Sequence, residues 1–385
     1  MKIRPLLASA VIAALTLAAC GGSDSAAPDT TAAAATGVDL LAAGCPETVS
    51  LQTDWHPEAE HGNLYQLIGP SYTVNTSKYR VTGDLMAGGK TTGVKVEIRA
   101  GGPAIGFQQV SSLLKQNPDV LLGFTSTDEQ VSHSGDEFAT IAVVAPFNIN
   151  PQIIMWDPET YPDVKTIADL KATGAKVRYF DGAAYMDYFT ATGILDKKQV
   201  DGTYDGGPAS FVAAGGKDTQ QGFGTSEPYF YKNVVKEWMK DVGYQYIHKA
   251  GWTAYAQSLG GTPSNIAKYD SCLKALVPVI QQAAVDYLAS PEKSNAIILD
   301  VVNQYNNDWV YTAGQAEAAV VKMQEDNLVA NSPDGTLGSF DMDRVTAFIE
   351  TATPVFTKTG SKVKEGLVAG DIVTNKYINP AIKLG

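Results

Sequence analysis

The chain has 385 residues, of which 44% are hydrophobic and 18% are charged, so it is long enough to bury one large core or two medium ones and is not disordered. Its formal net charge is −12, and only four of its arginines lie beyond the first twenty residues. Because no basic stripe is present, we expect no nucleic-acid partner.

The N-terminus has the pattern of an export signal. Lys2 and Arg4 precede an apolar run from Leu6 to Leu17, which is too short to span a bilayer. The run ends in Leu-Ala-Ala-Cys, so residues 1–19 are predicted to be a signal peptide and Cys20 to carry a lipid; a plain signal peptide with a chance cysteine is the alternative. The prediction is an extracytoplasmic protein that is lipid-anchored to the cell membrane.

The residues after the signal suggest a tether and then a crosslinked domain. Residues 20–44 are rich in Ala, Thr, Ser and Asp and are predicted to form the lipidated cysteine and a flexible tether. The two remaining cysteines, Cys45 and Cys272, are predicted to form a disulfide, because spare cysteines outside the cytoplasm usually pair. No metal-binding motif is present, so we expect no metal and no cofactor.

Strand-like and helix-like patterns alternate through the first two thirds of the chain. The predicted strands are residues 49–53, 94–99, 120–124, 140–145, 152–156, 176–180 and 244–248. The predicted helices are residues 105–116, 167–172, 184–192 and 229–242. This alternation is typical of an α/β protein with a mainly parallel sheet covered by helices on both faces.

The last third of the chain is mostly helical. Apolar residues recur with helical spacing from Leu273 to Ala284, and Pro278 within this run should bend the helix. The pair Ser290-Pro291 is predicted to begin the next helix, with serine as the cap and proline at the first position. Thr312, followed three residues later by a glutamine, fits a capping box.

An α/β first part, a second α/β unit and a helical return predict two lobes with a ligand cleft between them. The chain would cross between the lobes near Phe147 and again near Lys232. Lobe 1 is then residues 45–146 plus 233–385, and lobe 2 is residues 147–232.

The loop from Asp54 to Gly62 gathers side chains suited to binding. It holds a tryptophan, carboxylates and two of the chain's four histidines, and it joins a predicted strand to an apolar-periodic stretch. Loops at the carboxyl ends of strands line the ligand crevice of open α/β sheets. We therefore expect this loop to form one wall of the binding site.

The run Asp54-Trp55-x-Pro57-x-x-x-His61-Gly62 resembles the opening motif of the NMT1/THI5-like family. Further segments resemble family motifs in the same order, and the resemblance extends from residue 48 to about 305. These segments are residues 123–129, 166–171 with 176–179, 221–227 and 287–292.

The resemblance implies the two-lobe periplasmic-binding-protein fold, type II-like, and two functions found in the family. One is solute capture for an ABC importer; the other is a pyrimidine synthase that consumes PLP and one of its own histidines. The export signal favours the importer branch, and the chain lacks the cysteine-rich segment of the enzymes. We therefore expect a monomeric binding protein and not an enzyme, with permease and ATPase subunits as partners. A surface adhesin or sensor is a third possibility.

The resemblance also suggests the ligand. A small planar heterocycle, like a thiamine pyrimidine precursor, is the leading expectation, with riboflavin-like, aromatic or sulfonate ligands as alternatives. In the first lobe, Trp55 is expected to stack on the ligand ring and His61 to hydrogen-bond it, although either could be structural. Ser126 and Thr127 would offer hydroxyl and backbone N–H groups, or could simply cap a helix.

The second lobe contributes the other candidate ligand contacts. Asp181, Gly182 and Ala183 join a strand to a helix whose N-terminus favours acceptor groups; Asp181 could instead be only the helix cap. Tyr185 would complete a ring sandwich with Trp55. Glu227 would accept from an amine on the ligand, or could be a helix-start carboxylate.

Two segments depart from the family pattern. Residues 69–93 are rich in Gly, Thr and Tyr and predict an extra loop or hairpin beside the site. Residues 199–219 are predicted to be rich in loops.

Overall fold

The computed structural model describes residues 37–385. The predicted signal peptide, the predicted lipidation site at Cys20 and most of the predicted tether lie outside the described residues. Among the helices of residues 37–385, none is both long enough and apolar enough to cross a membrane.

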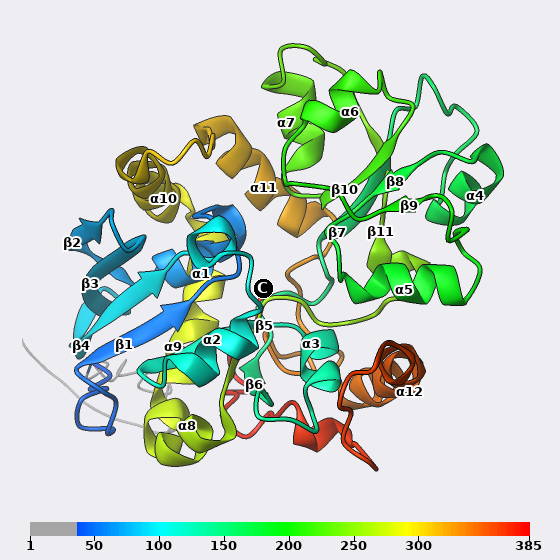
Figure 1. Cartoon of the computed structure of the whole chain (residues 1–385). Coiled ribbons are helices and arrows are strands. Elements are labelled where there is room, and N and C mark those ends of the chain that lie inside the picture. The colour runs from blue at the N-terminus through cyan, green and yellow to red at the C-terminus, as the bar shows by residue number, and fades with distance from the viewer. Residues whose placement is uncertain (1–36) are drawn as a thin grey trace, which may run out of the picture. The chain divides into compact units, whose positions relative to one another are not determined.

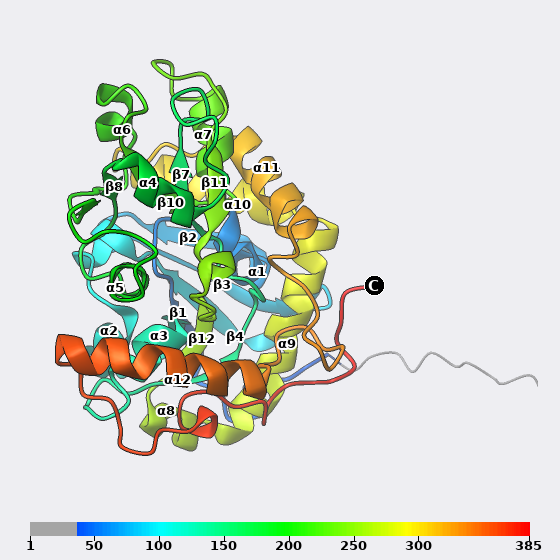
Figure 2. The ribbon, with the colours of Figure 1, turned by 90° about the vertical axis from the view of Figure 1, so that its right-hand side faces the viewer.

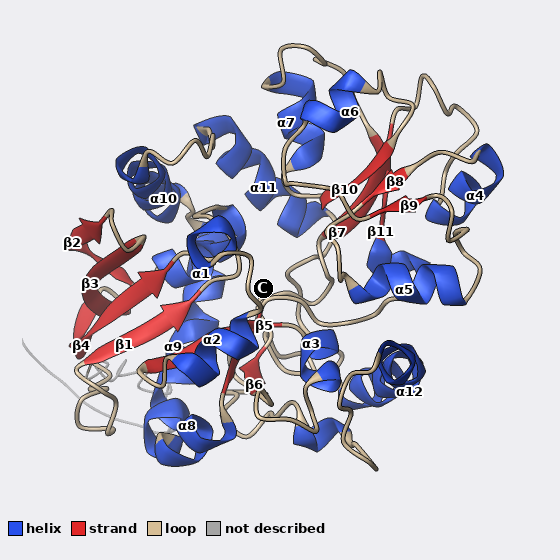
Figure 3. Ribbon diagram, in the orientation of Figure 1, coloured by secondary structure: helices blue, strands red, loops and turns tan. Residues whose placement is uncertain are grey.

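The first sheet has seven strands in the order β2-β3-β4-β1-β5-β12-β6 (Figures 1 and 3). These strands are β1 (Thr48–Gln52), β2 (Ile68–Asn75), β3 (Arg80–Ala87), β4 (Lys90–Arg99), β5 (Val120–Thr125), β6 (Ile141–Val144) and β12 (Ser258–Gly261). β1 is parallel to β4 and β5, whereas β12 is antiparallel to β5 and β6. Because β1 and β5 are parallel neighbours, the loops that follow them leave the sheet at the same edge.

The second sheet has five strands in the order β11-β7-β10-β8-β9. These strands are β7 (Gln152–Trp156), β8 (Val177–Arg178), β9 (Val200–Asp201), β10 (Thr219–Phe223) and β11 (Gly243–Tyr246). β8 is parallel to β9 and β10, and β7 is antiparallel to β10 and β11.

The chain crosses from the first sheet to the second between β6 and β7, and it returns between β11 and β12. The return therefore lies after Tyr246, and the predicted crossing near Lys232 is wrong. Residues 243–246 stay in the second sheet because β11 pairs along its whole length with β7. The two segments that connect the sheets are thus residues 145–151 and 247–257.

Twelve α-helices surround the two sheets within residues 37–385. They are α1 (Gly62–Tyr65), α2 (Val110–Gln116), α3 (Thr127–Ser132), α4 (Leu170–Thr173), α5 (Ala184–Ala191), α6 (Ala209–Ala213), α7 (Glu227–Asn233), α8 (Pro263–Lys268), α9 (Asp270–Ala289), α10 (Glu292–Tyr305), α11 (Ala313–Glu325) and α12 (Met342–Thr359). Short 3-10 helices lie at Ala59–His61, Gly102–Ile105, Ile167–Asp169, Ile247–Ala250 and Ala369–Asp371.

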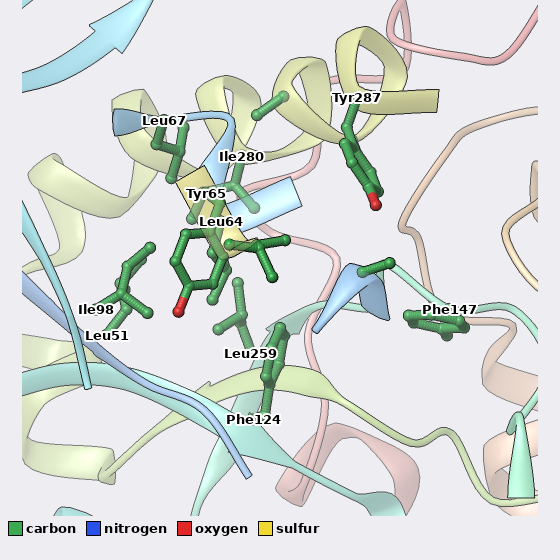
Figure 4. Close-up of a cluster of buried hydrophobic side chains, with 14 of the residues drawn as sticks. Leu51, Leu64, Tyr65, Leu67, Ile98, Phe124, Phe147, Leu259, Ile280 and Tyr287 are labelled. Carbon is green, nitrogen blue, oxygen red and sulfur yellow. The ribbon is translucent and has the colours of Figure 1, made fainter. Parts of the chain in front are cut away.

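The main core lies between the first sheet, α1 and α9. Figure 4 shows Leu51 of β1, Phe124 of β5 and Ile280 of α9 among its buried side chains. Helix α1 comes so close to α9 that a Cβ atom on Gly62 would lie 2.0 Å from the ring of Tyr287. Glycine at this position is therefore a packing requirement, and it fixes the end of the loop that begins at Asp54.

Helix α12 packs against helices that follow strands of both sheets (Figure 2). Val131 of α3, Phe189 of α5 and Phe348 of α12 are fully buried in one hydrophobic cluster. The last helix thus contributes core to both parts of the fold.

Several predicted elements begin or end elsewhere. The predicted helix 105–116 starts at Val110, because Gly106 and Phe107 both have left-handed φ angles, +65° and +58°. The predicted helix 229–242 is confirmed only as far as Asn233. Helix α10 begins at Glu292 with Pro291 at the cap position and no side-chain cap, so the serine cap was wrong. The Thr312 capping box is confirmed.

Strand β12 was not predicted. Its sequence, Ser-Leu-Gly-Gly, has low strand propensity, yet it pairs on both sides inside the first sheet. A Cβ atom on Gly260 would lie 2.6 Å from the hydroxyl oxygen of Thr125, so close packing against β5 explains a glycine there.

Residues 69–93 form most of the antiparallel meander β2-β3-β4 at one edge of the first sheet, which confirms a hairpin. None of these residues lines either of the two cavities described below, although β4 is the direct neighbour of β1, whose following loop does line one. An effect of the segment on the ligand stays a prediction. β1 and β5 lie between the meander and the rest of the sheet.

Cys45 and Cys272 form the predicted disulfide. The bond joins the segment before β1 to the first turn of α9, across a sequence separation of 227 residues.

Candidate functional site

Two adjoining cavities lie at the ends of β1, β5 and β10. The first, which we call the aromatic cavity, has a volume of about 210 Å³. It is lined by Asp54, Trp55, Glu58, Gln152, Phe180, Tyr204, Gly206, Gln221, Gly222, Phe223, Ser226, Glu227 and Trp309. Because this wall takes residues from the loops of both sheets, a ligand held there contacts both parts of the fold.

The second cavity, which we call the polar cavity, has a volume of about 260 Å³ and shares Asp54, Gln152 and Phe223 with the first. Its own walls come mainly from the segment before α2, the start of α3 and the start of α5. These residues are Gln108, Gln109, Val110, Phe124, Thr125, Ser126, Asp128, Glu129, Ser132, Asn150, Gly182, Ala183, Ala184, Tyr185, Ala256, Gln257 and Phe356.

Trp55 stands at the centre of the aromatic cavity, as its predicted ligand contact requires. Its ring centroid lies 5.6 Å from that of Phe180 on the second sheet's side. Glycines allow this position: a Cβ atom would lie 2.6 Å from the Trp55 ring at Gly102 and 3.2 Å from it at Gly206. Gly102 also has φ +56°, so a larger residue there would be both strained and in collision.

Trp309 forms a further wall that sequence reasoning missed. Its ring meets that of Trp55 at 83°, with centroids 6.3 Å apart, and stacks on His56 at 4.7 Å. The loop that carries it turns through Asn306 and Asp308, which both have left-handed φ angles. The sequence signal for this wall was the run Asn-Asn-Asp-Trp between two helices, because Asn and Asp adopt left-handed φ angles more readily than other non-glycine residues.

Phe180 and Tyr204 complete the aromatic wall, with centroids 4.8 Å apart. Tyr204 belongs to the segment 199–219, which has the predicted loops together with the short elements β9 and α6. The loop 202–208 therefore contributes Tyr204 and Gly206 to the site, a role that its composition did not suggest.

Three carboxylates face the aromatic cavity: Asp54, Glu58 and Glu227. Glu58 is only 5% exposed, and its pKa is raised well above the ordinary value by burial and then by the neighbouring carboxylates. Burial also raises the pKa of Glu227 to about 7, against the opposing effect of a hydrogen bond from the Phe223 N–H at 2.5 Å. Glu227 thus lines the cavity, as the sequence predicts, and Glu58 lines it as well.

His61 is fully buried and lines neither cavity, so we withdraw its predicted contact with the ligand. Its Nε2 lies 2.9 Å from Asp54 and 3.8 Å from Glu58. His61 ends the short 3-10 helix Ala59–His61, whose residues are all buried, and its ring packs against that of Phe124 in β5, with centroids 5.4 Å apart. His61 therefore positions Asp54.

Ser126, Gly182, Ala183 and Tyr185 line the polar cavity. Ser126 also caps α3, accepting from the Glu129 N–H, which confirms the capping alternative; its contact with a ligand stays a prediction. The Tyr185 hydroxyl donates to the side-chain oxygen of Gln221.

Three other predictions about these loops need correction. Thr127 lines neither cavity; it is buried, and its hydroxyl accepts from the Tyr255 N–H at 2.9 Å. Asp181 is exposed, lines neither cavity and does not cap α5, whose cap residue is Ala183. Tyr185 and Trp55 line different cavities, so they cannot sandwich one ring; Phe180 is the aromatic partner of Trp55 from the second lobe.

Within residues 37–385, no group of three or more His, Cys, Asp or Glu side chains is arranged to hold a metal ion. The residues that line the two cavities present aromatic rings, carboxyl groups, and amide or hydroxyl groups, all of which can bind a small ligand.

No protein-family model and no curated protein matches the sequence. The fold does match solved structures. The periplasmic aliphatic sulphonate binding protein SsuA from Escherichia coli aligns with a TM-score of 0.54 at 15% identity, covering 89% of this chain and 95% of that one. The ligand-binding component of an ABC-type import system from Staphylococcus aureus, solved with zinc bound, aligns with a TM-score of 0.51 at 10% identity, covering 86% and 98%.

A third match comes from Candida albicans. This gene product, described as exhibiting the generic periplasmic binding protein structural fold, aligns with a TM-score of 0.50 at 12% identity, covering 87% of this chain and 98% of that one. The chain therefore has the periplasmic-binding-protein fold, with two α/β parts and a largely helical C-terminal third.

Proposed function

We propose that this protein is an extracytoplasmic solute-binding lipoprotein of an ABC importer, which captures a small ligand between its two lobes and delivers it to a permease. The fold supports a binding role, because two solved structures that share it are ligand-binding proteins by description. The cavity supports it further, because its walls come from both sheets and a ligand there would favour the closed arrangement.

The proposed ligand is a small planar heterocycle with amino groups, similar to a thiamine pyrimidine precursor. The observation that carries this proposal is the combination of aromatic faces with hydrogen-bond acceptors in one small cavity. Trp55 and Phe180 offer apolar ring faces, and Glu58 and Glu227 offer carboxylate oxygens to N–H donors.

A sulfonate ligand is the alternative that the E. coli neighbour supports, and the start of α5 at residues 182–184, which lines the polar cavity, favours acceptor groups. The charges of the side chains favour the heterocycle. Among the described residues that line the two cavities there is no lysine or arginine, and several carboxylates face them. An anion would have to leave water without a cationic partner, which costs several kcal/mol. Uncharged riboflavin-like or other aromatic ligands would not have this desolvation cost.

A lipid on Cys20 would hold the protein at the outer face of the cell membrane, where permease and ATPase subunits are its expected partners, and it would act as a monomer. The synthase alternative remains disfavoured by the missing cysteine-rich segment.

A thermal-shift screen tests the proposed function. The purified domain, residues 37–385, would be heated with thiamine precursors, thiamine, flavins, purines, aliphatic sulfonates and amines. We expect nitrogen heterocycles to raise the Tm in a concentration-dependent way. If only aliphatic sulfonates raise it, the proposed ligand is wrong; if nothing does, the solute-binding role is wrong.

A further inference from the structure

The aromatic cavity has an excess of acidic groups. Asp54, Glu58 and Glu227 line it, and among the described residues neither cavity is lined by a lysine, arginine or histidine. The basic side chain beside this group is His61, 2.9 Å from Asp54 and 3.8 Å from Glu58. Glu60, buried behind the cavity wall, adds a fourth carboxyl group. Four carboxyl groups therefore lie beside one imidazole, and among the described residues neither cavity supplies a further basic side chain.

Glu58 is the member of this group that lines the cavity without a hydrogen-bond donor; behind the wall, one oxygen of Glu60 also has no partner among the described residues. Glu58 is only 5% exposed, and its carboxylate accepts no hydrogen bond from any donor within residues 37–385. A buried, ionised carboxylate without donors is several kcal/mol unfavourable. The open side of Glu58 is the cavity, so the missing partner must come from the ligand or from a bound proton.

The aromatic rings form a corner. Trp309 meets Trp55 at 83°, and Phe180 meets Trp55 at 60°, so the rings do not provide two parallel plates for a flat molecule. A compact cation can contact several ring faces at once, and each face attracts positive charge within about 6 Å of its centroid. The shape of this corner therefore suits a compact ammonium or amino substituent, with the ring of the ligand lying beyond it.

We propose that the aromatic cavity binds a positively charged ammonium group of the ligand, between the ring faces of Trp55, Phe180 and Trp309 and the carboxylates of Glu58 and Glu227. This inference rests on the proposed function and adds the charge of the ligand and the place where that charge lies. It makes the protein a receptor for organic cations, with the opposite charge preference to a sulfonate-binding protein.

The rest of the ligand extends into the polar cavity. The two cavities share three wall residues, Asp54, Gln152 and Phe223, so a ligand of sufficient length can contact residues of both. The planar, hydrogen-bonding part of the ligand then lies among the amide and hydroxyl groups of the polar cavity, such as Gln257 and Ser126.

Protonation supports this arrangement. Burial, followed by the neighbouring carboxylates, raises the pKa of Glu58, and burial raises that of Glu227 to about 7. The raised pKa values favour the protonated form of both carboxyl groups before binding, whereas a bound ammonium group favours the carboxylate form. Binding of the cation therefore releases protons to the solvent.

Three probes that share a benzene ring test the charge preference. Benzyltrimethylammonium, benzyl alcohol and benzenesulfonate carry positive, no and negative charge, and isothermal titration calorimetry would measure the Kd of each. We expect the cation to bind at least about tenfold more tightly than the alcohol, and the sulfonate not to bind. Titration in buffers of different ionisation enthalpy should show proton release with the cation.

Variants locate the effect. Glu58→Gln and Glu227→Gln should each weaken binding of the cation about tenfold and leave binding of the alcohol unchanged. If Glu58→Gln fails to fold, Glu227→Gln still provides the test, because its amide oxygen can accept the hydrogen bond from the Phe223 N–H and so preserve the fold. Glu237→Gln is the matched control: it changes the net charge equally at an exposed position outside both cavities and should leave both affinities unchanged.

The outcomes separate this inference from the proposed function. If benzenesulfonate or neutral rings bind and cations do not, the ammonium site is refuted while the solute-binding role stands. Equal loss of both affinities in the two glutamine variants would also refute it. If no compound of any charge binds, here or in the wider screen, the proposed function fails as well.

Discussion

The hydroxyl of Thr225 donates a hydrogen bond to the carboxylate of Glu60, and both side chains are buried. Glu60 lies in the 3-10 helix that follows β1 of the first sheet, whereas Thr225 follows β10 of the second. This bond between residues 165 positions apart ties the two loops together behind the aromatic cavity. It couples the lobes through the same loops that carry Glu58 and Glu227.

Removing this hydroxyl should destabilise the protein. In Thr225→Val the carboxylate of Glu60 would lose its side-chain donor while staying buried, and its other oxygen already has no partner among the described residues. We expect a loss of about 1–3 kcal/mol in the free energy of unfolding, measured by urea denaturation. Thr225→Ser keeps the hydroxyl and should behave like the parent; equal stability of the valine variant would show that the bond contributes nothing.

Replacing Trp55 should remove binding while sparing the fold. Its side chain is partly exposed to the cavity, so Trp55→Ala should cost less than about 2 kcal/mol of stability but weaken ligand binding at least about tenfold. Trp238→Ala is the contrasting variant. Trp238 is buried against Phe211 and lines neither cavity, so its loss should cost about 3–5 kcal/mol and leave the affinity unchanged. The reverse pattern would make Trp55 a packing residue.

The raised pKa of Glu227 predicts how stability changes with pH. The folded-state pKa is about 7, above the ordinary value of 4.5, so between these pH values the folded protein holds a proton that the unfolded chain has lost. This group's contribution to stability is therefore complete below pH 4.5 and falls as the pH rises to about 7. Denaturation of the parent and of Glu227→Gln across pH 4–8 should show a smaller fall in the variant, where the raised pKa of Glu58 still contributes in the same direction.

The same group predicts a pH dependence of binding. The titratable neighbours of Glu227 are Glu60, Glu58, Tyr204 and Tyr231, and none of these four can carry a positive charge. None of them therefore competes with a cationic ligand for the Glu227 carboxylate. Affinity for benzyltrimethylammonium should rise as the pH increases from 6 to 8 and Glu227 ionises. In Glu227→Gln this rise should become shallower; an unchanged profile would assign it to another group.

The disulfide should contribute substantially to stability. Cys45 and Cys272 close a loop of more than two hundred residues, for which the chain-entropy model gives up to about 5 kcal/mol. The double variant Cys45→Ala with Cys272→Ala should melt at a lower temperature than the parent under oxidising conditions. Dithiothreitol should lower the parent's Tm to that of the variant and leave the variant's Tm unchanged.

Arg344 of α12 joins the two segments that cross between the sheets. Its guanidinium donates to the carbonyl oxygens of Asn148 and Thr253 and lies over the ring of Tyr255, 3.8 Å from the centroid. Arg344→Lys keeps the charge but loses the planar fork, so we expect a loss of about 1.5–3 kcal/mol of stability. The same variant should increase hydrogen exchange in residues 145–151 and 247–257; unchanged exchange there would confine the role of Arg344 to packing.

Much of the fold could be predicted from local patterns. The strand Gln152–Trp156 and the capping box at Thr312 appear as expected, because each is decided by residues close together in sequence. Strand β12 was missed because its glycine-rich sequence forms a strand only between two specific neighbours. The crossing predicted near Lys232 failed for the same reason, since pairing with β7 decides where β11 belongs.

The sequence alone determined that a short loop after the first strand would line the candidate cavity, that Trp55 and Glu227 would lie there, and that Cys45 and Cys272 would pair; contact of Trp55 and Glu227 with a ligand stays a prediction. These follow from residue types and from their positions next to strands. Only the tertiary structure decided the directions of the side chains. A single 3-10 turn buries His61, and a strained loop more than two hundred residues away brings Trp309 against Trp55. Such choices depend on contacts between distant segments, which no local pattern records.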